Sequence, residues 1–510
     1  MNTLLGGFLS SLSILGTWLV LAALLAGVGL GIRRAFGLRG LRSDDVIAGF
    51  WMGFAATCFF LQIWHFWRPI NAAAFGVMVG AGLVSMVWVR KDIAGWLGEI
   101  PWRSRMGELL VLGLAALWVA NHAMNSPNAM NDTGLYHWPV MKWAASYPIV
   151  PGIANLHHRL GYQNVHLLFA AMFNVGPWAG RVFHIVNGLI IGVALIQMLW
   201  SGFRMLRAPA GGRARFAADL VLLAPVVALV GSPHVSSLTT DSVSAVILYV
   251  LVSRLFAALI DSSANTRATA YELGALATLC VLAVASKLSA VGFAGPAWLL
   301  VAWVAVRRLS GQPSLRRRTL AWMAGTALFF GGVYATRGVI QSGHPAFPSN
   351  AASFSVDWST PAEMGEADRG LIRYRARHFY DRPSVPGSAT DDTPLNAPWV
   401  LGWIRNIAVM PMVLEPGLLI LVAILALVSR RRRNTEKSEA SLVFLPLVVG
   451  LAFWFWSAPN PRFGQFLFWI AAATMVGEAF RRSAEHLARK QLVIGVLGTL
   501  ALILFALASS

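Results

Sequence analysis

Charged residues are scarce in this sequence. Asp, Glu, Lys and Arg make up only 12% of its 510 residues, against about a quarter of a typical soluble chain. The polar linkers that would separate several soluble domains in a chain of this length are also missing. Hydrophobic residues account for 57%, in repeated apolar runs near the roughly 20 residues that a bilayer-spanning helix needs. The sequence therefore predicts an all-α polytopic membrane protein embedded in a lipid bilayer.

Cysteine is rare in the sequence, and the glycine-rich motifs that bind nucleotides are absent. Cys58 and Cys280 are the only two cysteines, and both lie inside apolar runs, where we expect packing rather than a metal site or a redox pair. The chain has no Walker A loop and no dinucleotide-binding motif, so ATP-driven transport and nicotinamide chemistry are not expected.

Acidic residues are outnumbered by basic ones, 22 to 41, which gives a net charge of +19. This surplus does not indicate a nucleic-acid partner, because the basic residues form short clusters between apolar runs, as in cytoplasmic loops of membrane proteins. The clusters are Arg33, Arg34, Arg39 and Arg42; Arg90, Lys91, Arg103 and Arg105; Arg204, Arg207, Arg213 and Arg215; Arg307, Arg308 and Arg316 to Arg318; Arg430 to Arg433; and Arg481, Arg482, Arg489 and Lys490.

Placing every cluster in the cytoplasm predicts roughly 14 transmembrane helices with both chain ends outside. The first apolar run is followed rather than preceded by positive charge, so we expect an uncleaved helix and not a signal peptide. The region 399–429 is expected to hold either one span or a surface helix followed by a span. The predicted spans are about 11–32, 46–66, 71–89, 107–124, 182–201, 216–232, 241–259, 271–287, 289–306, 319–340, 400–429, 441–457, 465–480 and 491–508.

This topology divides the chain into four regions and gathers its polar segments on the outer face. The regions are N-terminal helices (1–106), a core (107–340) with a first outer loop (125–181), a second outer loop (341–398), and C-terminal helices (399–510). Shorter outer connections occur at 232–240 and 458–464. Sequence features with chemical potential are concentrated in the outer segments.

The first outer loop is rich in aromatic residues, histidine and proline. Residues 134–146 and 163–175 each predict a short helix lying in the membrane interface, where Trp138 and Trp143 suit the headgroup layer. Asp132 emerges at the outer end of a span. Its carboxylate could serve as a general base, hold a divalent cation, or cap the 134–146 helix. The sequence leaves these three roles open.

The same loop contains a compact group of hydrogen-bond donors, His157, His158 and Arg159. Arginine binds phosphate through two hydrogen bonds, so this group could bind a phosphate, or it could contact lipid headgroups without specificity. Adjacent histidines are poorly placed to chelate one zinc ion. His137 and Lys142 are weaker candidates for the same phosphate-binding role.

Other outer segments add further candidates. His234 could face the same cavity as Asp132, and Asp241 or Thr240 is expected to cap the following helix. Three cations occur at the outer ends of spans: Lys287, Arg337 and Arg462. A lysine or arginine there either anchors the helix at the interface or binds phosphate. Arg462 falls in the first turn of a helix, where a positive charge requires an anionic partner.

The segment 350–398 alone has the composition of a soluble domain. Thr360 to Glu363 predict a capping box with Pro361 at the first helical position, and the helix should run to about Tyr380. His344 lies just before this segment, in the run from Ser342 to Ser349. We expect a lid or an acceptor-binding cap over the membrane cavity, with a plain solvated loop as the alternative.

Together these motifs resemble a family of bacterial multi-pass membrane proteins that is similar to the GT-C glycosyltransferase superfamily. The resemblance rests on the segments Asp132–His137, Tyr147–His157, Ser342–Pro345 and Ala458–Phe463. It implies a GT-C-like fold with periplasmic surface helices and loops, in which a span precedes a large outer loop that starts with the catalytic acid. GT-C enzymes often carry paired acidic residues, whereas Asn131 stands here beside a lone Asp132. This departure favours a general base that works without a metal, although a divalent cation stays an option.

The resemblance also implies a function. A sugar would pass from a polyprenyl-phosphate-linked donor to a lipid, glycan or protein acceptor on the periplasmic face of the inner membrane, with inversion, as in cell-envelope polysaccharide biosynthesis. Asp132 would activate the acceptor, and Arg159, Arg337, Arg462 and Lys287 would stabilise the departing phosphate. The alternatives are a polysaccharide polymerase or ligase with a pyrophosphate-linked donor, and a transporter or flippase for lipid-linked glycans, which would need polar residues at mid-membrane.

Overall fold

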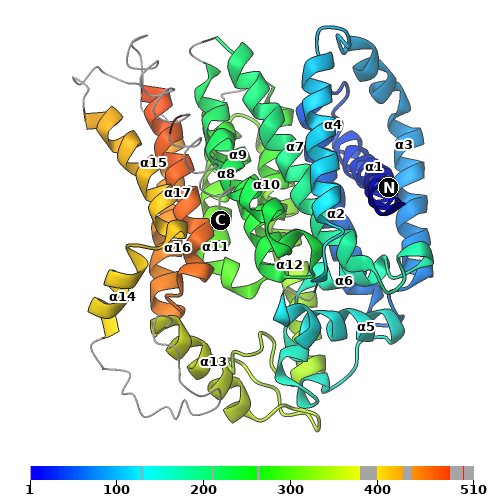
Figure 1. The fold of residues 1–510 in the computed structure, drawn as a ribbon, viewed down its shortest axis with the longest axis vertical. Helices are drawn as coiled ribbons and strands as arrows, with labels where there is room; N and C mark the ends of the chain where they lie inside the picture. Colours follow the sequence, from blue (N-terminus) through cyan, green and yellow to red (C-terminus); the bar gives the residue numbers. More distant parts are fainter. Residues whose placement is uncertain are drawn as a thin grey trace.

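The computed structural model describes residues 2–127, 130–209, 212–260, 265–378, 399–428 and 439–482, together with Gly498. The described residues form helices and no strands (Figure 1). Eleven of these helices are long and apolar enough to cross a membrane. They are α1 (Asn2–Ala35), α2 (Ser43–Trp64), α3 (Ala72–Glu99), α7 (Val186–Arg207), α8 (Ala214–Gly231), α9 (Thr240–Ile260), α10 (Thr266–Ser286), α11 (Val291–Arg308), α15 (Pro411–Val428), α16 (Phe444–Ser457) and α17 (Pro461–Arg482). The spans of α7, α11 and α16 include the 3-10 turn before each helix and begin at Val182, Leu288 and Glu439.

The prediction of a polytopic helical membrane protein is confirmed, and the eleven spans fall where spans are predicted. Three further predicted spans differ. Helix α4 (Met106–His122) is apolar but has only 17 residues, and α12 (Pro313–Ser342) is long but interrupted by polar residues. The predicted span 491–508 lies outside the described residues, apart from Gly498. The region 399–429 divides, as one interpretation expected, into α14 (Trp399–Ile407) and α15.

The bundle has two polar ends. Basic clusters gather at the upper end in Figure 1, where α3 connects to α4 and α7 to α8. There Arg308 pairs with Glu439 at 2.8 Å, and Arg204 pairs with Asp44. We call this the arginine-rich end. The first loop, with α5 (Trp138–Ser146), and the helix α13 (Ala362–Arg377) lie together at the opposite, lower end, which we call the Asp132 end. The predicted gathering of the polar loops at one end is thus observed.

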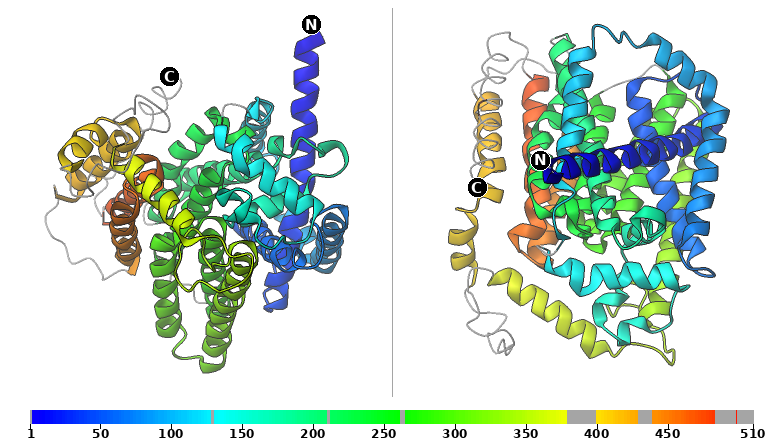
Figure 2. Two further views of the ribbon diagram at one scale, coloured as in Figure 1. Left: turned by 90° about the horizontal axis from the view of Figure 1, so that it is seen from below. Right: turned by 45° about the vertical axis from the view of Figure 1, so that its right-hand side comes forward.

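Helix α1 crosses the bundle obliquely, as the two views of Figure 2 show. Its closest approach is to α2, at two glycines spaced four residues apart, Gly49 and Gly53. A Cβ atom on Gly53 would lie 1.8 Å from the carbonyl oxygen of Leu25 in α1. Small residues at this spacing allow two membrane helices to approach backbone to backbone.

The first loop forms the two predicted helices, but only one of them lies at the surface. A π-helical turn, η2 (Thr133–His137), leads directly into α5, which runs across the end of the bundle (Figure 1). The second helix, α6 (Val165–Met172), is shorter than predicted and all eight of its residues are buried. Apart from His166, every residue of α6 is apolar, so the helix packs inside the protein, against α2 and α5, and not in the interface.

Helix α13 begins where the sequence predicts a helix, but without the predicted capping box. Pro361 occupies the N-cap position in an extended conformation, and no side chain caps the helix. The Thr360 hydroxyl is buried without a hydrogen-bond partner among the described residues. Pro361 therefore separates Thr360 from the first turn. The predicted end of the helix near Tyr380, and the rest of 379–398, lie outside the described residues.

Candidate functional site

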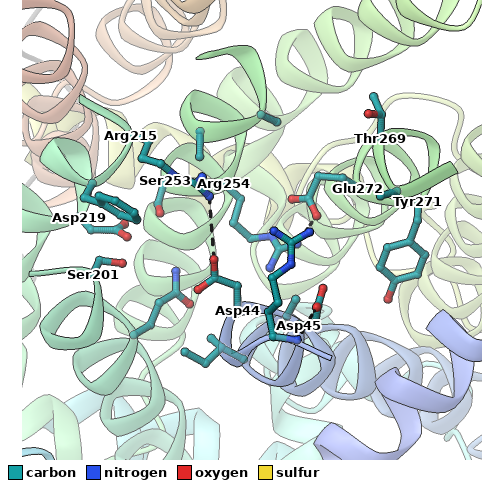
Figure 3. A pocket seen from close by; sticks show the side chains of 18 of the residues that line it. Asp44, Asp45, Ser201, Arg215, Asp219, Ser253, Arg254, Thr269, Tyr271 and Glu272 are labelled. Atoms are coloured by element: carbon teal, nitrogen blue, oxygen red, sulfur yellow. Dashed lines mark hydrogen bonds and ion pairs between the residues drawn. The ribbon is translucent and has the colours of Figure 1, made fainter. Parts of the chain in front are cut away.

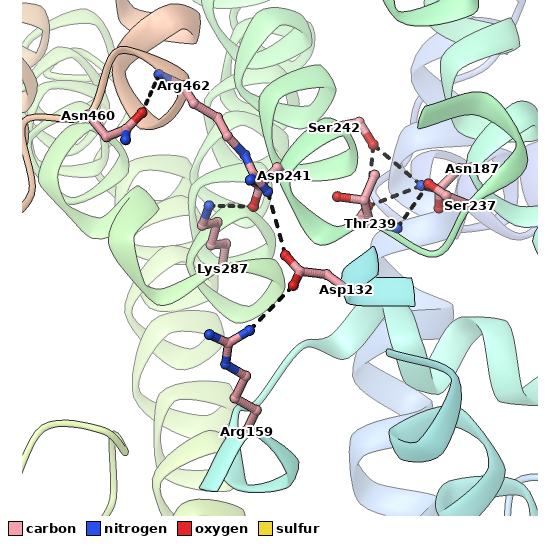
Figure 4. Close-up of polar contacts among 10 residues, drawn as sticks. All are labelled: Asp132, Arg159, Asn187, Ser237, Thr239, Asp241, Ser242, Lys287, Asn460 and Arg462. Atoms are coloured by element: carbon pink, nitrogen blue, oxygen red, sulfur yellow. Dashed lines mark hydrogen bonds and ion pairs between the residues drawn. The ribbon is translucent and has the colours of Figure 1, made fainter. Parts of the chain in front are cut away.

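Five charged residues from five separate segments meet at the Asp132 end (Figure 4). Each lies at the end of a helix, where a polar side chain can reach the edge of the apolar core. Asp132 precedes η2, Arg159 lies in the 3-10 turn η4 (His158–Gly161), and Asp241 lies in the first turn of α9. Lys287 directly follows α10, and Arg462 is the second residue of α17. We call these five residues the charge cluster.

The charge cluster is a continuous chain of ion pairs. Arg159 Nη1 lies 3.3 Å from Asp132 Oδ1, and Arg462 Nη2 lies 3.6 Å from Asp132 Oδ2. The same Nη2 atom donates to Asp241 Oδ2 at 3.1 Å, and Lys287 Nζ donates to Asp241 Oδ1 at 2.5 Å. Arg462 therefore bridges the two carboxylates, and the expectation that its position requires an anionic partner is met by acidic side chains.

Asp132 does not act as a helix cap. It adopts a helical backbone conformation, with φ −61° and ψ −26°, and its side chain accepts no hydrogen bond from the turn that follows. The carboxylate is instead directed to Arg159 and Arg462 and keeps 30% of its side-chain surface exposed. A carboxylate held between two cations while still open to solvent can exchange its partners for a ligand.

Asp241 is the charged residue that sequence reasoning did not place in the site. It was expected to cap α9, but its carboxylate is engaged by Lys287 and Arg462. The signal available in the sequence was an acidic residue in the first turn of a span at the same end as Asp132. That signal alone does not separate a cap from an ion pair, because the partner residues lie 46 and 221 positions away.

The charge cluster holds three cations and two carboxylates, a surplus of one positive charge (3 − 2 = +1). Aromatic faces surround the cations. The Arg159 guanidinium lies 5.3 Å from the ring centre of Tyr136, and Lys287 Nζ lies 5.1 Å from that of Phe463. Such faces stabilise a cation without neutralising it. The surplus charge thus favours an anionic ligand.

His137 lies buried beside the charge cluster with 1% of its surface exposed. Neither of its ring nitrogens has a hydrogen-bond partner among the described residues. Burial lowers the pKa of His137 to about 4, against the opposing attraction of Asp241. The imidazole is therefore neutral near pH 7 and able to accept or donate one hydrogen bond. Burial likewise raises the pKa of the neighbouring Tyr136, with a further contribution from Asp132.

His157 and His158 hold the site together rather than join the ion-pair chain. Their rings stack with centres 4.7 Å apart, and His157 Nδ1 accepts a hydrogen bond from the Arg159 backbone N–H at 3.2 Å. His158 Nε2 lies 3.1 Å from Asp368 Oδ1 on α13. The other oxygen of Asp368 accepts a hydrogen bond from the Tyr162 hydroxyl. The first loop thereby anchors α13 through one buried carboxylate.

Of the remaining predicted residues, His234 lies beside the charge cluster, whereas Lys142, His344 and Arg337 do not. His234 is half-buried near Asp241, and burial lowers its pKa. Lys142 is exposed on α5, with Nζ 5.5 Å from the ring centre of Trp138. His344 is buried and bonded through Nε2 to the Thr360 carbonyl oxygen at 2.9 Å.

Arg337 is buried away from the charge cluster. Its Nη1 atom donates to the Gln62 carbonyl oxygen at 3.4 Å and lies 3.1 Å from His65 Nδ1. Burial and the Arg337 charge lower the pKa of His65 to about 3. The site thus brings together Asp132, Arg159, Lys287 and Arg462, with His137 and His234 beside them, while Lys142, Arg337 and His344 have other environments.

The described residues contain no group of three or more His, Cys, Asp or Glu side chains that could hold a metal ion. The two carboxylates of the charge cluster are already paired with cations. Three cations around two acids are arranged to bind an anion and to move a proton at a carboxylate.

The fold and the charge cluster define a class: polytopic helical membrane proteins with an anion-attracting site at one end of the bundle. The model of a family described as "Domain of unknown function (DUF8201)" matches residues 12–469. The chain belongs to this family. No curated protein and no solved structure matches the chain.

Proposed function

We propose that this protein is a GT-C-type membrane glycosyltransferase of the inner membrane, with its active site facing the periplasm. It transfers a sugar from a polyprenyl-phosphate-linked donor to a hydroxyl group of a lipid, glycan or protein acceptor. The observation that carries the proposal is the partly exposed Asp132 carboxylate, set between the guanidinium groups of Arg159 and Arg462 at the end of the bundle. A carboxylate between two cations supports the proposal, because a carboxylate can serve as a base and the cations can hold a phosphate leaving group.

The reaction is a single displacement that inverts the anomeric carbon. Asp132 takes the proton of the acceptor hydroxyl while the acceptor oxygen forms a bond to the anomeric carbon. The bond between that carbon and the phosphate oxygen breaks, and its electron pair leaves with the polyprenyl phosphate. Arg159, Arg462 and Lys287 stabilise the negative charge that develops on the leaving phosphate.

Between the two acids, Asp132 is better suited to be the base. Its side chain is 30% exposed, whereas that of Asp241 is 21% exposed. Asp241 is also tied more closely, to Lys287 at 2.5 Å and Arg462 at 3.1 Å. We assign Asp241 the role of holding these two cations in place. When a donor phosphate binds, Arg462 can turn from Asp132 to the phosphate, which frees the carboxylate to accept a proton.

The elements around the charge cluster agree with this proposal. Helix α5 follows Asp132 in the first loop and runs across the end of the bundle, which supports the likeness to the GT-C layout, whereas the buried α6 departs from it. Helix α13 is joined to the same loop by Asp368, and we assign it the role of a cap over the acceptor.

The test is a turnover assay in nanodiscs. Wild type, Asp132→Asn and Asp357→Asn are incubated with a panel of polyprenyl-phosphate sugars and a membrane-lipid or glycan extract, with and without EDTA. Free polyprenyl phosphate is followed by mass spectrometry. Asp357 is an exposed acid at the same end of the bundle and forms no ion pair with a described residue, so it is the matched control. We expect Asp132→Asn to lower turnover by about a hundredfold or more, in line with loss of a general base, and Asp357→Asn to leave it unchanged.

Equal turnover by wild type and Asp132→Asn would overturn the assignment of Asp132. Pyrophosphate-linked donors in the same panel separate a transferase from a polymerase or ligase, since only the latter releases polyprenyl pyrophosphate. The EDTA arm decides whether a divalent cation takes part.

A further inference from the structure

A second polar site lies at the arginine-rich end, remote from the charge cluster. It is a cavity of about 270 Å³ between α2, α7, α8, α9 and α10 (Figure 3). This volume is slightly below the roughly 300 Å³ of the smallest pockets for drug-sized ligands, so the cavity can hold only a small molecule or a lipid headgroup.

The lining of this cavity carries a positive surplus. Six arginines and four carboxylates line it, a formal charge of +2 (6 − 4). Asp44 is shared by two of the arginines, Arg204 and Arg215, the latter at 3.9 Å. The exposed guanidinium of Arg42 forms no ion pair with a described residue. The other lining arginines each have an acidic partner: Arg33 pairs with Asp45, Arg254 with Glu272, and Arg308 with Glu439, which lies just outside the lining. The positive charge left for a ligand is therefore that of Arg42 and of the two arginines that share Asp44. The charged residues are Arg33, Arg42, Arg204, Arg215, Arg254, Arg308, Asp44, Asp45, Asp219 and Glu272.

The deeper wall holds polar atoms that lack partners. Ser201 and Ser253 are hydrogen-bonded to the Asp219 carboxylate, but its Oδ1 atom forms no hydrogen bond with the described residues. Trp200 Nε1 and the Tyr271 hydroxyl are likewise buried without one. The side chains of Asp219, Trp200 and Tyr271 are only 5%, 9% and 5% exposed, and all of them line the cavity. Buried polar groups are normally hydrogen-bonded. A ligand with its own donors and acceptors would satisfy them.

We propose that this cavity binds a phosphate ester that carries hydroxyl groups. The arginines are suited to the phosphate, since a guanidinium group donates two parallel hydrogen bonds to it. Asp219 accepts a hydrogen bond from a ligand hydroxyl, while Trp200 donates one. A phospholipid headgroup and a soluble sugar or polyol phosphate share this chemistry. The site is independent of the proposed transferase reaction, because the two lie at opposite ends of the bundle.

The experiment uses the full chain in phosphatidylcholine nanodiscs with sn-glycerol 3-phosphate as the soluble probe and inorganic phosphate and glycerol as partial probes. Thermal unfolding reports binding, because a ligand that binds only the folded state raises the Tm saturably. In a second arm, native mass spectrometry follows retention of phosphatidylglycerol against phosphatidylcholine. The variants are Arg42→Gln, Asp219→Asn and the control Arg39→Gln, which removes the same charge from the same loop but does not line the cavity.

We expect Arg42→Gln to weaken binding about tenfold, as for loss of a hydrogen bond to a charged group, and Arg39→Gln to bind like wild type. Asp219→Asn should abolish the preference for glycerol 3-phosphate over inorganic phosphate. Saturable binding in the first arm identifies a soluble ligand, and selective retention in the second identifies a lipid. The proposal is overturned if neither arm shows binding, or if Arg39→Gln and Arg42→Gln lose it equally.

Discussion

At the scale of single residues, burial shifts the pKa values of side chains in and beside the charge cluster. His137 illustrates this, because it is buried beside four charged groups without a hydrogen bond of its own among the described residues. Its pKa is lowered to about 4, whereas an unfolded histidine titrates near 6.5. Between these values the unfolded chain binds a proton that the folded chain does not, so folding stability falls as the pH falls.

We therefore predict that His137 contributes to acid sensitivity. The contribution of neutral His137 to the free energy of unfolding is complete above about pH 6.5 and is lost progressively toward pH 4. At pH 5 the loss is on the order of 2 kcal/mol. The Tm of wild type should fall more between pH 7.5 and pH 5 than that of His137→Gln. His65 is not coupled to His137 and titrates equally in both proteins, so the double difference reports His137 together with its direct effect on the neighbouring His166. Parallel pH curves for the two proteins would refute this prediction.

The individual residues of the site were only partly predictable. Asp132 and Arg462 could be identified because each stands out locally, one as a lone acid after a span and the other as a cation in a helix first turn. The ion pair between Asp241 and Lys287 could not be predicted, because it joins the start of α9 to the end of α10 and depends on how the two helices pack. Arg337 looks equivalent to Arg462 in the sequence, and only the packing of α12 against α2 directs it to His65 instead.

At the scale of elements, α13 depends on one carboxylate. Asp368 has 4% of its side chain exposed and joins α13 to both His158 and Tyr162. We predict that Asp368→Asn makes local opening of α13 about tenfold more frequent, because the loss of a charged hydrogen-bond acceptor changes the equilibrium between the closed and open helix by roughly that factor.

Hydrogen exchange of residues 362–377 measures this effect. Exchange should rise about tenfold in Asp368→Asn and stay at the wild-type rate in Glu363→Gln, because Glu363 is exposed in the first turn of the same helix. If both variants exchange alike, α13 is held by something other than Asp368.

The crossing of α1 and α2 gives a second prediction for an element. Gly53→Ala would place a Cβ atom 1.8 Å from the Leu25 carbonyl oxygen, so the two helices would have to separate. We expect the free energy of unfolding to fall by about 1–3 kcal/mol, which is measured as a lower Tm. Gly16→Ala, in the partner helix α1 and with no atom within 4 Å of the new Cβ, should leave the Tm unchanged or raise it. A Gly53→Ala protein as stable as wild type would contradict the close packing.

At this scale, prediction succeeded where a helix is defined by its own residues. The spans follow from apolar length, and the start of α13 from its proline. The burial of α6 was missed, because an apolar octamer can lie in an interface or in a core, and the choice depends on partners such as α2. The absence of a cap on α13 was missed because the capping pattern was assigned without regard to the extended conformation of Pro361.

For the whole molecule, the separation of the two polar ends predicts its orientation. Arginine-rich loops stay in the cytoplasm, so the Asp132 end should face the periplasm. Single cysteines at the exposed positions Ser353 and Ser310 test this, since the native Cys58 and Cys280 are buried. An impermeant maleimide should label Ser353→Cys in right-side-out vesicles only and Ser310→Cys in inverted vesicles only. The reverse pattern would place the site in the cytoplasm.

The buried helix α6 has a consequence for how the chain is made. Its eight residues emerge from the ribosome early, yet His166 is bonded to the carbonyl oxygen of Leu238 at 3.2 Å, 72 residues later in the chain. A helix of this length is too short to insert across a bilayer by itself. During synthesis α6 can pack early against α2 and α5, but its contact with Leu238 must await the segment that leads into α9. The first loop therefore reaches its final structure only after 72 further residues have been made.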